Sequence, residues 1–342
     1  MIIILKQQTA AKTKHALQQH FGGQTDIFVH DNRIALNKVT ENDLTEQEKA
    51  GIQDIITDHP AAVQGSRAFH PEDTVIKLPH TTIGGPQGFT MMAGPCSVES
   101  ETHVAKMAKV AHDGGATVLR GGAFKPRTSP YSFQGLGVDG LKFLRQAADQ
   151  QGMDMITEVM DEEHLEVVCQ YTDMLQIGAR NMQNFSLLKA VGKTNKPVLL
   201  KRGMSASIDD LLNAAEYIAA GGNHQIALSE RGIRSFDDKY TRNLFDVSSV
   251  PVLHKLTHYP IIVDPSHAEG HWDLVTPMAL AGTASGADGV VVEIHDNPAK
   301  AFSDGPQALK PEIFKEMTKE VFALHDVLNS FGQNTKGAVV NG

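Results

Sequence analysis

The sequence predicts an α/β protein in which a (β/α)8 TIM barrel follows a small α+β domain. From Gly88 onward, short apolar runs alternate with helical patterns at spacings of roughly 20 to 36 residues, which is typical of βα units around a parallel sheet. Eight such units span about 250 residues, the usual size of a barrel of this kind. The first seventy residues show a different order of elements and therefore predict a separate domain.

The amino-terminal domain is predicted from its strand and helix patterns. The second helix is expected to begin after Thr45 as its N-cap and to continue through Ile52, Ile55 and Ile56, which repeat at helical spacing before Pro60. A last extended segment follows. This βαββαβ order predicts a small α+β sandwich, equally compatible with oligomerisation and with ligand sensing. The earlier elements are expected as strands at 2–5, 26–29 and 33–36 and an amphipathic helix at about 10–21.

The boundary between the domains is expected at the polar, proline-containing segment 69–73. We therefore predict an amino-terminal domain over 1–68, a barrel over 69–332 and a flexible tail over 333–342. No dinucleotide-binding or Walker A glycine motif is present to favour an open, doubly wound sheet. A hairpin is expected at 74–78 and 81–83, and the eight barrel strands at 89–93, 117–119, 155–157, 174–177, 197–200, 225–228, 261–263 and 290–292.

Charge balance and cysteine content narrow the class of protein. The 31 Lys and Arg residues are outnumbered by 40 Asp and Glu, and the resulting net charge of -9 argues against a nucleic-acid-binding surface. Two cysteines cannot build a disulfide framework and favour a reducing compartment. The first apolar run is too short for a secretory signal, and none approaches the roughly 20 residues that cross a bilayer. We expect a soluble, cytoplasmic protein.

A reactive or charged residue follows each predicted barrel strand. In a (β/α)8 barrel the carboxyl ends of the strands meet at one mouth, where the loops build the active site. Such residues at all eight strand exits on one face would repel one another and lose hydration unless a ligand compensated them. These residues are Cys96, Arg120, Glu158, Arg180, Lys201, Glu230 with Arg231, His267 and Glu293.

The cations in this region predict a site for more than one anionic group. Arg matches phosphate and carboxylate oxygens with paired hydrogen bonds, and Lys supplies a point charge or a proton. The segment Lys125-Pro126-Arg127-Thr128-Ser129 combines two cations with two hydroxyls on a loop that proline stiffens, so it is a candidate phosphate-binding loop. The expected cations are Arg120, Lys125, Arg127, Arg180, Lys201, Arg231 and, further along the chain, Arg234.

A second group of side chains could hold a divalent transition-metal ion. It combines a thiol, an imidazole and two carboxylates, a mixed donor set that does not specify the metal. Pro265 fixes the turn after the seventh strand and should present the histidine at the mouth. Cys169, in contrast, lies in a helical pattern, and we expect it in the core. The candidate ligands are Cys96, His267, Glu293 and Asp304.

Six stretches carry a resemblance to a known family: AGPCS at 93–97, LRGGAFKPRTSP at 119–130, IGARN at 177–181, LKRG at 200–203, ERG at 230–232 and DPSH at 264–267. They resemble the 3-deoxy-D-arabino-heptulosonate 7-phosphate (DAHP) synthases of the type I beta subgroup, relatives of the 3-deoxy-manno-octulosonate 8-phosphate synthases. The resemblance covers about 69–304, and several long motifs in the right order make it specific.

The resemblance implies a transferase that condenses phosphoenolpyruvate with erythrose 4-phosphate and water, giving DAHP and phosphate. This reaction opens the shikimate pathway to chorismate and the aromatic amino acids. Lys125 would protonate the aldehyde oxygen, which the metal polarises, and Glu158 would orient the attacking water. Cys96, His267, Glu293 and Asp304 would hold one ion of Mn2+, Fe2+, Co2+ or Zn2+. By the same resemblance, Arg120, Lys125, Arg180, Lys201 and Arg231 would hold phosphoenolpyruvate, while Arg127, Thr128 and Ser129 would hold the sugar phosphate.

The resemblance also extends to the amino-terminal region and to substrate choice. The first seventy residues resemble the ferredoxin-like (ACT-like) domain of some members, so feedback inhibition by tyrosine or phenylalanine and a homotetramer are expected; a domain that only packs the tetramer is the alternative. The octulosonate synthases carry Ala-Asn between the lysine and the arginine of the loop. Lys-Pro-Arg-Thr-Ser therefore favours the four-carbon sugar.

Three alternatives stay open from the sequence. A condensation with arabinose 5-phosphate would make the chain an octulosonate synthase. A Schiff-base aldolase would use Lys201 as the nucleophile, because this lysine ends the fifth strand. A phospho-sugar sensor on a barrel scaffold would bind its ligand without turnover.

Overall fold

The computed structural model describes residues 1–85, 88–125, 129 and 131–331. Contacts within the chain define two compact units. The first comprises Met1–Glu72 together with Leu256–His258, and the second runs from Asp73 to Lys255 and resumes at Tyr259. The predicted tail at 333–342 lies outside the described residues.

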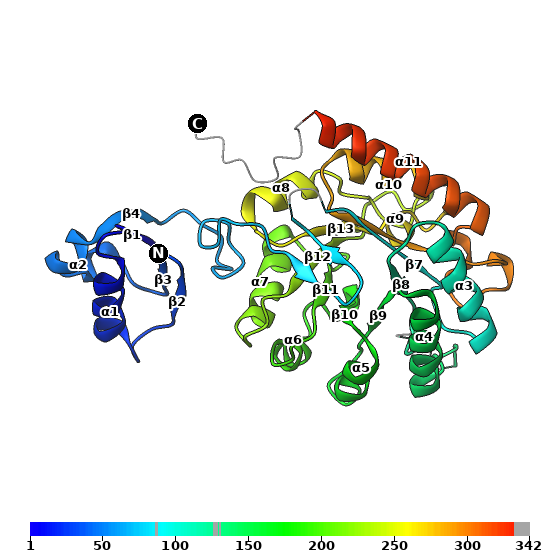
Figure 1. Ribbon diagram of the computed structural model, residues 1–342, viewed down its shortest axis with the longest axis horizontal. Coiled ribbons are helices and arrows are strands. Elements are labelled where there is room, and N and C mark those ends of the chain that lie inside the picture. Colours follow the sequence, from blue (N-terminus) through cyan, green and yellow to red (C-terminus); the bar gives the residue numbers. More distant parts are fainter. Residues whose placement is uncertain (86–87, 126–128, 130, 332–342) are drawn as a thin grey trace. The chain divides into compact units, whose positions relative to one another are not determined.

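The amino-terminal unit has the predicted βαββαβ order (Figure 1). Its four strands form one antiparallel sheet in the order β2-β3-β1-β4, the arrangement of a ferredoxin-like fold. Leu17 and Phe21 of the first helix pack against Ile3 and Ile34 of the sheet, which gives this unit its own apolar core. The elements are β1 (Ile2–Leu5), α1 (Ala10–Phe21), β2 (Ile27–His30), β3 (Arg33–Leu36), α2 (Glu46–Ala50) and β4 (Ile52–Ile56), with a 3-10 turn at Glu41–Asp43.

The second helix ends earlier than its apolar spacing predicted. Thr45 is its N-cap as expected, since Glu48 N–H donates to the Thr45 hydroxyl at 3.3 Å. The helix stops at Ala50, however, and Ile52–Ile56 form strand β4, in which Ile55 pairs with Ile3. The predicted helix over these isoleucines was therefore wrong. Their β-branched side chains favour a pleated surface, and pairing with β1 outweighed a spacing that was also compatible with a helix.

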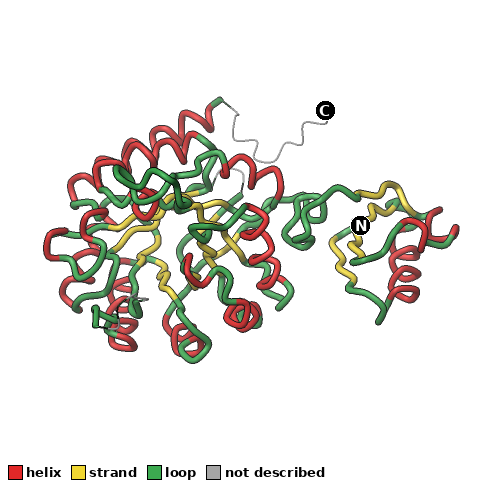
Figure 2. Tube along the Cα trace, turned by 180° about the vertical axis from the view of Figure 1, so that it is seen from behind, coloured by secondary structure: helices red, strands yellow, loops and turns green. Residues whose placement is uncertain are grey.

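The second unit contains the predicted eight-stranded parallel barrel, with helices outside it (Figures 1 and 2). The described strands close into a ring in which each pairs with the next and the last, β14, pairs with the first, β7. They are β7 (Thr90–Gly94), β8 (Val118–Arg120), β9 (Asp154–Glu158), β10 (Met174–Ile177), β11 (Val198–Lys201), β12 (Ile226–Glu230), β13 (Ile261–Val263) and β14 (Gly289–Glu293).

Helices connect these strands and cover the barrel. Several begin at side-chain caps; Ser207, for example, accepts the Asp210 N–H at 3.1 Å before α7. The helices are α3 (Glu101–Asp113), α4 (Gly137–Gln151), α5 (Leu165–Tyr171), α6 (Phe185–Gly192), α7 (Ile208–Ala219), α8 (Ser249–Leu256), α9 (Pro265–Glu269), α10 (Trp272–Ala284) and α11 (Pro311–Ser330), with 3-10 turns at Ala179–Asn181, Pro298–Lys300 and Gly305–Gln307. Among the described residues, no helix combines the length and apolarity needed to span a membrane.

The amino-terminal end of the barrel is closed by the predicted hairpin. Its strands, β5 (Ile76–Lys77) and β6 (Thr82–Ile83), pair antiparallel. Ile76 and Ile83 are fully buried and join one apolar cluster with residues from all eight barrel strands, such as Val118 and Met174 at strand starts. Because this end is filled with apolar side chains, the opposite end is left for polar chemistry.

Cys169 is half-buried, not in the core as predicted. It lies in α5, whose Val168 is fully buried. Neighbouring residues on a helix are rotated by about 100°, so Cys169 turns partly away from the face that packs on the barrel.

Candidate active site

A cavity of about 440 Å³ opens among the loops that follow the barrel strands. Six cations and two carboxylates line it among the described residues. It brings together most of the residues predicted from the strand ends, which come from seven different strand exits. The predicted residues that line it are Arg120, Lys125, Ser129, Glu158, Arg180, Lys201, Arg231, His267 and Asp304.

Some of the predicted residues are placed elsewhere. Glu230 is buried and accepts a hydrogen bond from Arg202 at 2.9 Å, so it neutralises a neighbouring cation and does not line the cavity. Arg234 lines a separate cavity of about 220 Å³. Arg127 and Thr128 lie outside the described residues.

The four candidate metal ligands converge beside the cavity. Cys96 Sγ lies 3.3 Å from Asp304 Oδ2, and His267 Nε2 lies 3.3 Å from Glu293 Oε1. One ligand atom each from Cys96, Glu293 and Asp304 fits within 4.8 Å of the others. Cys96 and Asp304 are 208 positions apart in the sequence, and the barrel brings them into contact.

The charges of this group fit a bound cation. Burial, reinforced by the negative charge of Glu293, raises the pKa of the Cys96 thiol to about 12. Burial would also raise the pKa of Asp304, but His267 and Arg242 outweigh it and lower that pKa to about 2. A buried thiol held between carboxylates is unfavourable as a thiolate by itself, and a transition-metal ion is the partner that stabilises it. The donor set therefore matches a divalent transition-metal ion.

Lys125 and Arg120 connect the ligand group to the cavity. Lys125 Nζ lies 3.2 Å from Cys96 Sγ and donates to the Cys96 carbonyl at 3.0 Å. Burial opposes its charge, but Cys96 and Glu293 raise the pKa of Lys125 above its ordinary value, so it stays an ammonium. Arg120 donates to Glu293 at 2.9 Å, while its buried Nε finds no hydrogen-bond partner among the described residues. A buried donor of this kind indicates an anionic ligand.

Lys201 belongs to a buried chain of charges. It is ion-paired with Asp264, whose other partner, His267 Nδ1, lies 2.8 Å from Asp264 Oδ2. Burial would raise the pKa of Asp264, but His267 and Lys201 hold it well below its ordinary value. Asp264 is therefore an anion that orients both side chains. Lys201 is held as the positive partner of this anion, which disfavours a Schiff-base nucleophile.

Small residues at two strand ends make this close packing feasible. A Cβ on Gly178 would lie 2.0 Å from Glu158 Oε1, and one on Gly94 would lie 1.9 Å from the Arg120 carbonyl oxygen. Any side chain there would displace a residue of the site. The glycines of the predicted motifs thus serve the site through close approach.

Among the site residues that the sequence did not predict are three that contact the candidate metal ligands. Asp264 stands in the quoted motif DPSH, three residues before His267, and the capping signal of an Asp before Pro could have identified it. Arg242 lines the cavity and reaches Asp304 at 3.3 Å, but it lies far from a strand end. Gln307 donates to Glu293 at 2.6 Å and carries no charge that would have marked it.

Comparisons with known proteins agree with this geometry. The DAHP synthetase I family matches residues 66–328. A phospho-2-dehydro-3-deoxyheptonate aldolase of Thermotoga maritima is 54% identical over 263 residues, which are 77% of each chain. The crystal structure of a phospho-2-dehydro-3-deoxyheptonate aldolase (DAHP synthase) from the same organism has a TM-score of 0.77 and 43% identity, covering 96% of this chain and 97% of that one.

Octulosonate enzymes are more distant. A 2-dehydro-3-deoxyphosphooctonate aldolase of Koribacter versatilis is 31% identical over 273 residues, which are 74% of this chain and 96% of that protein. The chain is thus more similar to the heptulosonate enzyme than to the octulosonate enzyme, which favours the predicted function. The chain belongs to the DAHP synthetase I family, as its sequence motifs predicted.

Proposed function

We propose that this chain condenses phosphoenolpyruvate with D-erythrose 4-phosphate and water to give DAHP and inorganic phosphate. One observation carries the proposal: a cavity lined by six cations, among the described residues, lies against a buried thiol, imidazole and carboxylate group. Phosphoenolpyruvate brings a carboxylate and a phosphate, and the sugar brings a second phosphate. The cation excess matches these three anionic groups.

The cavity residues have separable tasks in this reaction. Arg120, Lys125, Arg180, Lys201 and Arg231 hold phosphoenolpyruvate, because they line the cavity and two of them are fixed by buried carboxylates. Ser129 lines the same cavity. In this proposal it holds the sugar phosphate with Arg127 and Thr128, which lie outside the described residues.

Proton transfer falls to Lys125. The enol carbon of phosphoenolpyruvate attacks the aldehyde carbon, and the aldehyde oxygen takes a proton from the Lys125 ammonium. A divalent ion held by Cys96, His267, Glu293 and Asp304 would supply Lewis-acid stabilisation of that oxygen. Glu158 faces the cavity and accepts a weak hydrogen bond from Gln176 at 3.4 Å, which leaves its carboxylate able to orient the water that adds to C2. Phosphate then leaves by cleavage of its bond to C2, and the oxygen from water becomes the C2 carbonyl. Of the two protons that this oxygen loses, one returns to Lys125 and one goes to the departing phosphate.

The metal is one ion of Mn2+, Fe2+, Co2+ or Zn2+ in this proposal. Softness of the thiolate favours Fe2+, Co2+ or Zn2+ over Mg2+, whereas the two carboxylates also admit Mn2+. Removing the ion with a chelator and adding each metal back separately would rank them by recovered turnover.

The first test is loss of the enol absorbance of phosphoenolpyruvate. We expect chelator-sensitive loss with erythrose 4-phosphate and none with arabinose 5-phosphate. Loss with arabinose 5-phosphate alone would favour the octulosonate reaction. Covalent trapping by borohydride with a carbonyl substrate would favour the Schiff-base alternative, and binding without turnover after metal addition would favour a sensor.

The amino-terminal unit is proposed as a regulatory or oligomerisation domain of a cytoplasmic homotetramer, with tyrosine or phenylalanine as feedback effector. Support comes from its ferredoxin-like sheet and from the Thermotoga structure, whose match extends over 96% of this chain and so includes this unit. Turnover measured while titrating each amino acid tests the effector, and sedimentation tests the tetramer. Unchanged turnover with both amino acids would leave oligomerisation as the role of this unit.

A further inference from the structure

We propose that Glu99 is a positioning residue that holds Asp304 in place for metal binding. The inference rests on the proposed function, because it concerns the same metal group. Glu99 follows Cys96 by three residues on the loop after β7, whereas Asp304 lies on the long connection between β14 and α11. Two ligands of one ion thus come from separate loops, and something must fix the distance between those loops.

Asp304 has an unfavourable backbone conformation. Its φ of 48° and ψ of 30° place it in the left-handed region. Within the described part of the chain, the other non-glycine residues in this region are Asp31 and Lys38. The next residue, Gly305, packs directly against the backbone of Pro298, since a Cβ there would lie 2.1 Å from the Pro298 carbonyl oxygen. Such a conformation persists only when surrounding contacts enforce it.

Both carboxylate oxygens of Glu99 contact the segment that leads to Asp304. Phe302 N–H donates to Glu99 Oε1 at 2.7 Å, and His295 Nε2 lies 3.4 Å from Glu99 Oε2. A parallel contact joins the buried hydroxyls of Ser97 and Ser303 at 2.8 Å. These contacts tie the Cys96 loop to the two residues before Asp304.

The hydrogen bonds of His295 determine whether Glu99 donates or accepts in its contact with this ring. Asn297 N–H donates to His295 Nδ1 at 2.9 Å, so in the neutral ring the proton is on Nε2. His295 Nε2 is then a donor toward Glu99, and Glu99 must accept with both oxygens. Glu99, His103 and His295 also place ligand-type atoms within 4.8 Å of one another. Since Nε2 of His295 carries the proton, this group is a hydrogen-bonded link and not a second metal site.

This geometry makes Glu99→Gln a sharp variant. Glutamine has the same shape but only one acceptor oxygen. If that oxygen still accepts the Phe302 N–H, the amide NH2 group of the glutamine faces His295 Nε2, which is also a donor. The hydrogen bond to His295 is then lost. Changes at a direct hydrogen-bond partner of a metal ligand cost about 10- to 100-fold in metal affinity, and Glu99, which acts on Asp304 through Phe302, should show a loss toward the lower end of that range. Glu101→Gln is the matched control, because Glu101 is an exposed glutamate two residues further on that contacts Gln146 at 3.4 Å.

The experiment titrates Co2+ into the chelator-treated full-length chain and follows the thiolate-to-cobalt charge-transfer band of Cys96. We expect Glu99→Gln to raise the Kd for Co2+ about 10- to 100-fold, toward the lower end of that range. Glu101→Gln should change this Kd less than about twofold. Ser303→Ala, which removes the parallel tie, should weaken the Kd severalfold and provides a second variant if Glu99→Gln does not fold.

The outcomes separate this inference from the proposed function. Wild-type chain that binds no Co2+ would overturn the metal group itself. Wild-type binding with an unchanged Kd in both Glu99→Gln and Ser303→Ala would overturn only the role of Glu99. A lower thermal transition of metal-free Glu99→Gln with an unchanged Kd would likewise make Glu99 a purely structural residue and overturn the inference.

Discussion

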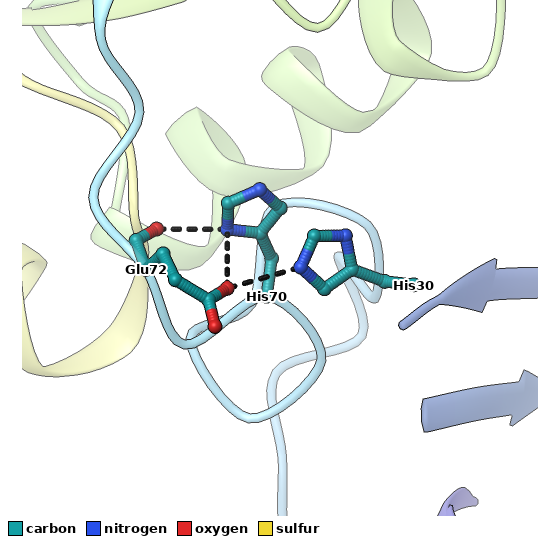
Figure 3. A group of neighbouring side chains, drawn as sticks. All are labelled: His30, His70 and Glu72. Atoms are coloured by element: carbon teal, nitrogen blue, oxygen red, sulfur yellow. Dashed lines mark hydrogen bonds and ion pairs between the residues drawn. The ribbon is translucent and has the colours of Figure 1, made fainter. Parts of the chain in front are cut away.

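Besides the Glu99 group, two groups of side chains in the described part of the chain have the composition of a metal site, and they differ in burial. The first, called the exposed group because Glu72 is exposed while its two histidines are half-buried, is His30, His70 and Glu72 of the amino-terminal unit (Figure 3). The buried group is Cys96, Glu293 and Asp304 of the barrel. Each places three ligand-type atoms within 4.8 Å of one another. Proximity alone therefore does not distinguish them.

Hydrogen bonding and burial do distinguish them. In the exposed group His30 Nε2 lies 3.0 Å from Glu72 Oε2 and His70 Nδ1 lies 2.8 Å from the Glu72 carbonyl oxygen, so ordinary hydrogen bonds account for both rings (Figure 3). Glu72 is 61% exposed and hydrated. In the buried group Glu293 is 1% and Cys96 4% exposed, so water does not compensate the Glu293 carboxylate, which pairs with Arg120, and would not compensate a Cys96 thiolate. A ligand group therefore needs a cation when it is both anionic and dry.

The largest expected effect is on the buried thiol. Cys96→Ala should lower turnover at least about 1000-fold, because Lewis-acid stabilisation of several kcal/mol depends on the complete ligand set. His70→Ala should change turnover less than about twofold. Phosphoenolpyruvate consumption and metal content per chain measure both variants. If Cys96→Ala kept the metal content of the wild type, or if His70→Ala lost it, the metal would belong to the exposed group and not to the buried one.

A cation next to the buried group should matter almost as much. Lys125→Met should lower kcat about 100- to 10,000-fold, since it removes a positioned proton donor. Lys142→Met is the control: this lysine is 54% exposed and pairs with Asp139 at 3.1 Å, in an ion pair that water screens. Steady-state kinetics checks the pair of variants. If Lys125→Met and Lys142→Met lowered kcat equally, burial would not distinguish a catalytic lysine from a surface lysine in this protein.

Metal binding should also raise the free energy of unfolding. An ion at about 100 times its Kd should stabilise the folded chain by about 2.7 kcal/mol, by mass action on the native state. The gain should vanish in Cys96→Ala and persist in the double variant His30→Asn/His70→Asn. Thermal unfolding with and without the ion tests this. A gain that depends on the histidines would place the ion in the exposed group.

The smallest effect is expected from the exposed group and depends on pH. Burial, with the neighbouring His30, lowers the pKa of His70 below its ordinary 6.5. The folded state then binds fewer protons than the unfolded state, so the stability contributed by His70 is complete above pH 6.5 and falls as the pH drops below it. His70→Asn should lose less stability between about pH 7.5 and pH 5.5 than the wild type. Unfolding curves at the two pH values measure the difference, and equal losses would contradict it.

The sequence predicted which side chains gather at the barrel mouth better than it predicted some elements of the fold. Cys96, Arg120, Lys125 and His267 follow strands whose ends could be located, and the barrel rule places all such ends at one mouth. The strand at Ile52–Ile56 was missed because its spacing also fitted a helix, and only pairing with β1 decided between them. Arg234 and Glu230 were misplaced because charge at a strand end does not show which way the side chain turns.

The sequence by itself determined the family, the barrel and the types of chemical group at its mouth, because strand periodicity and motif order are local properties of the chain. Only the tertiary structure decided which groups are paired. Asp264 orients Lys201 and His267, Gln307 supports Glu293, and Glu99 reaches Phe302 across more than two hundred residues. Such contacts depend on how separate loops converge in space, where burial removes water and makes each hydrogen bond and charge depend on its neighbours.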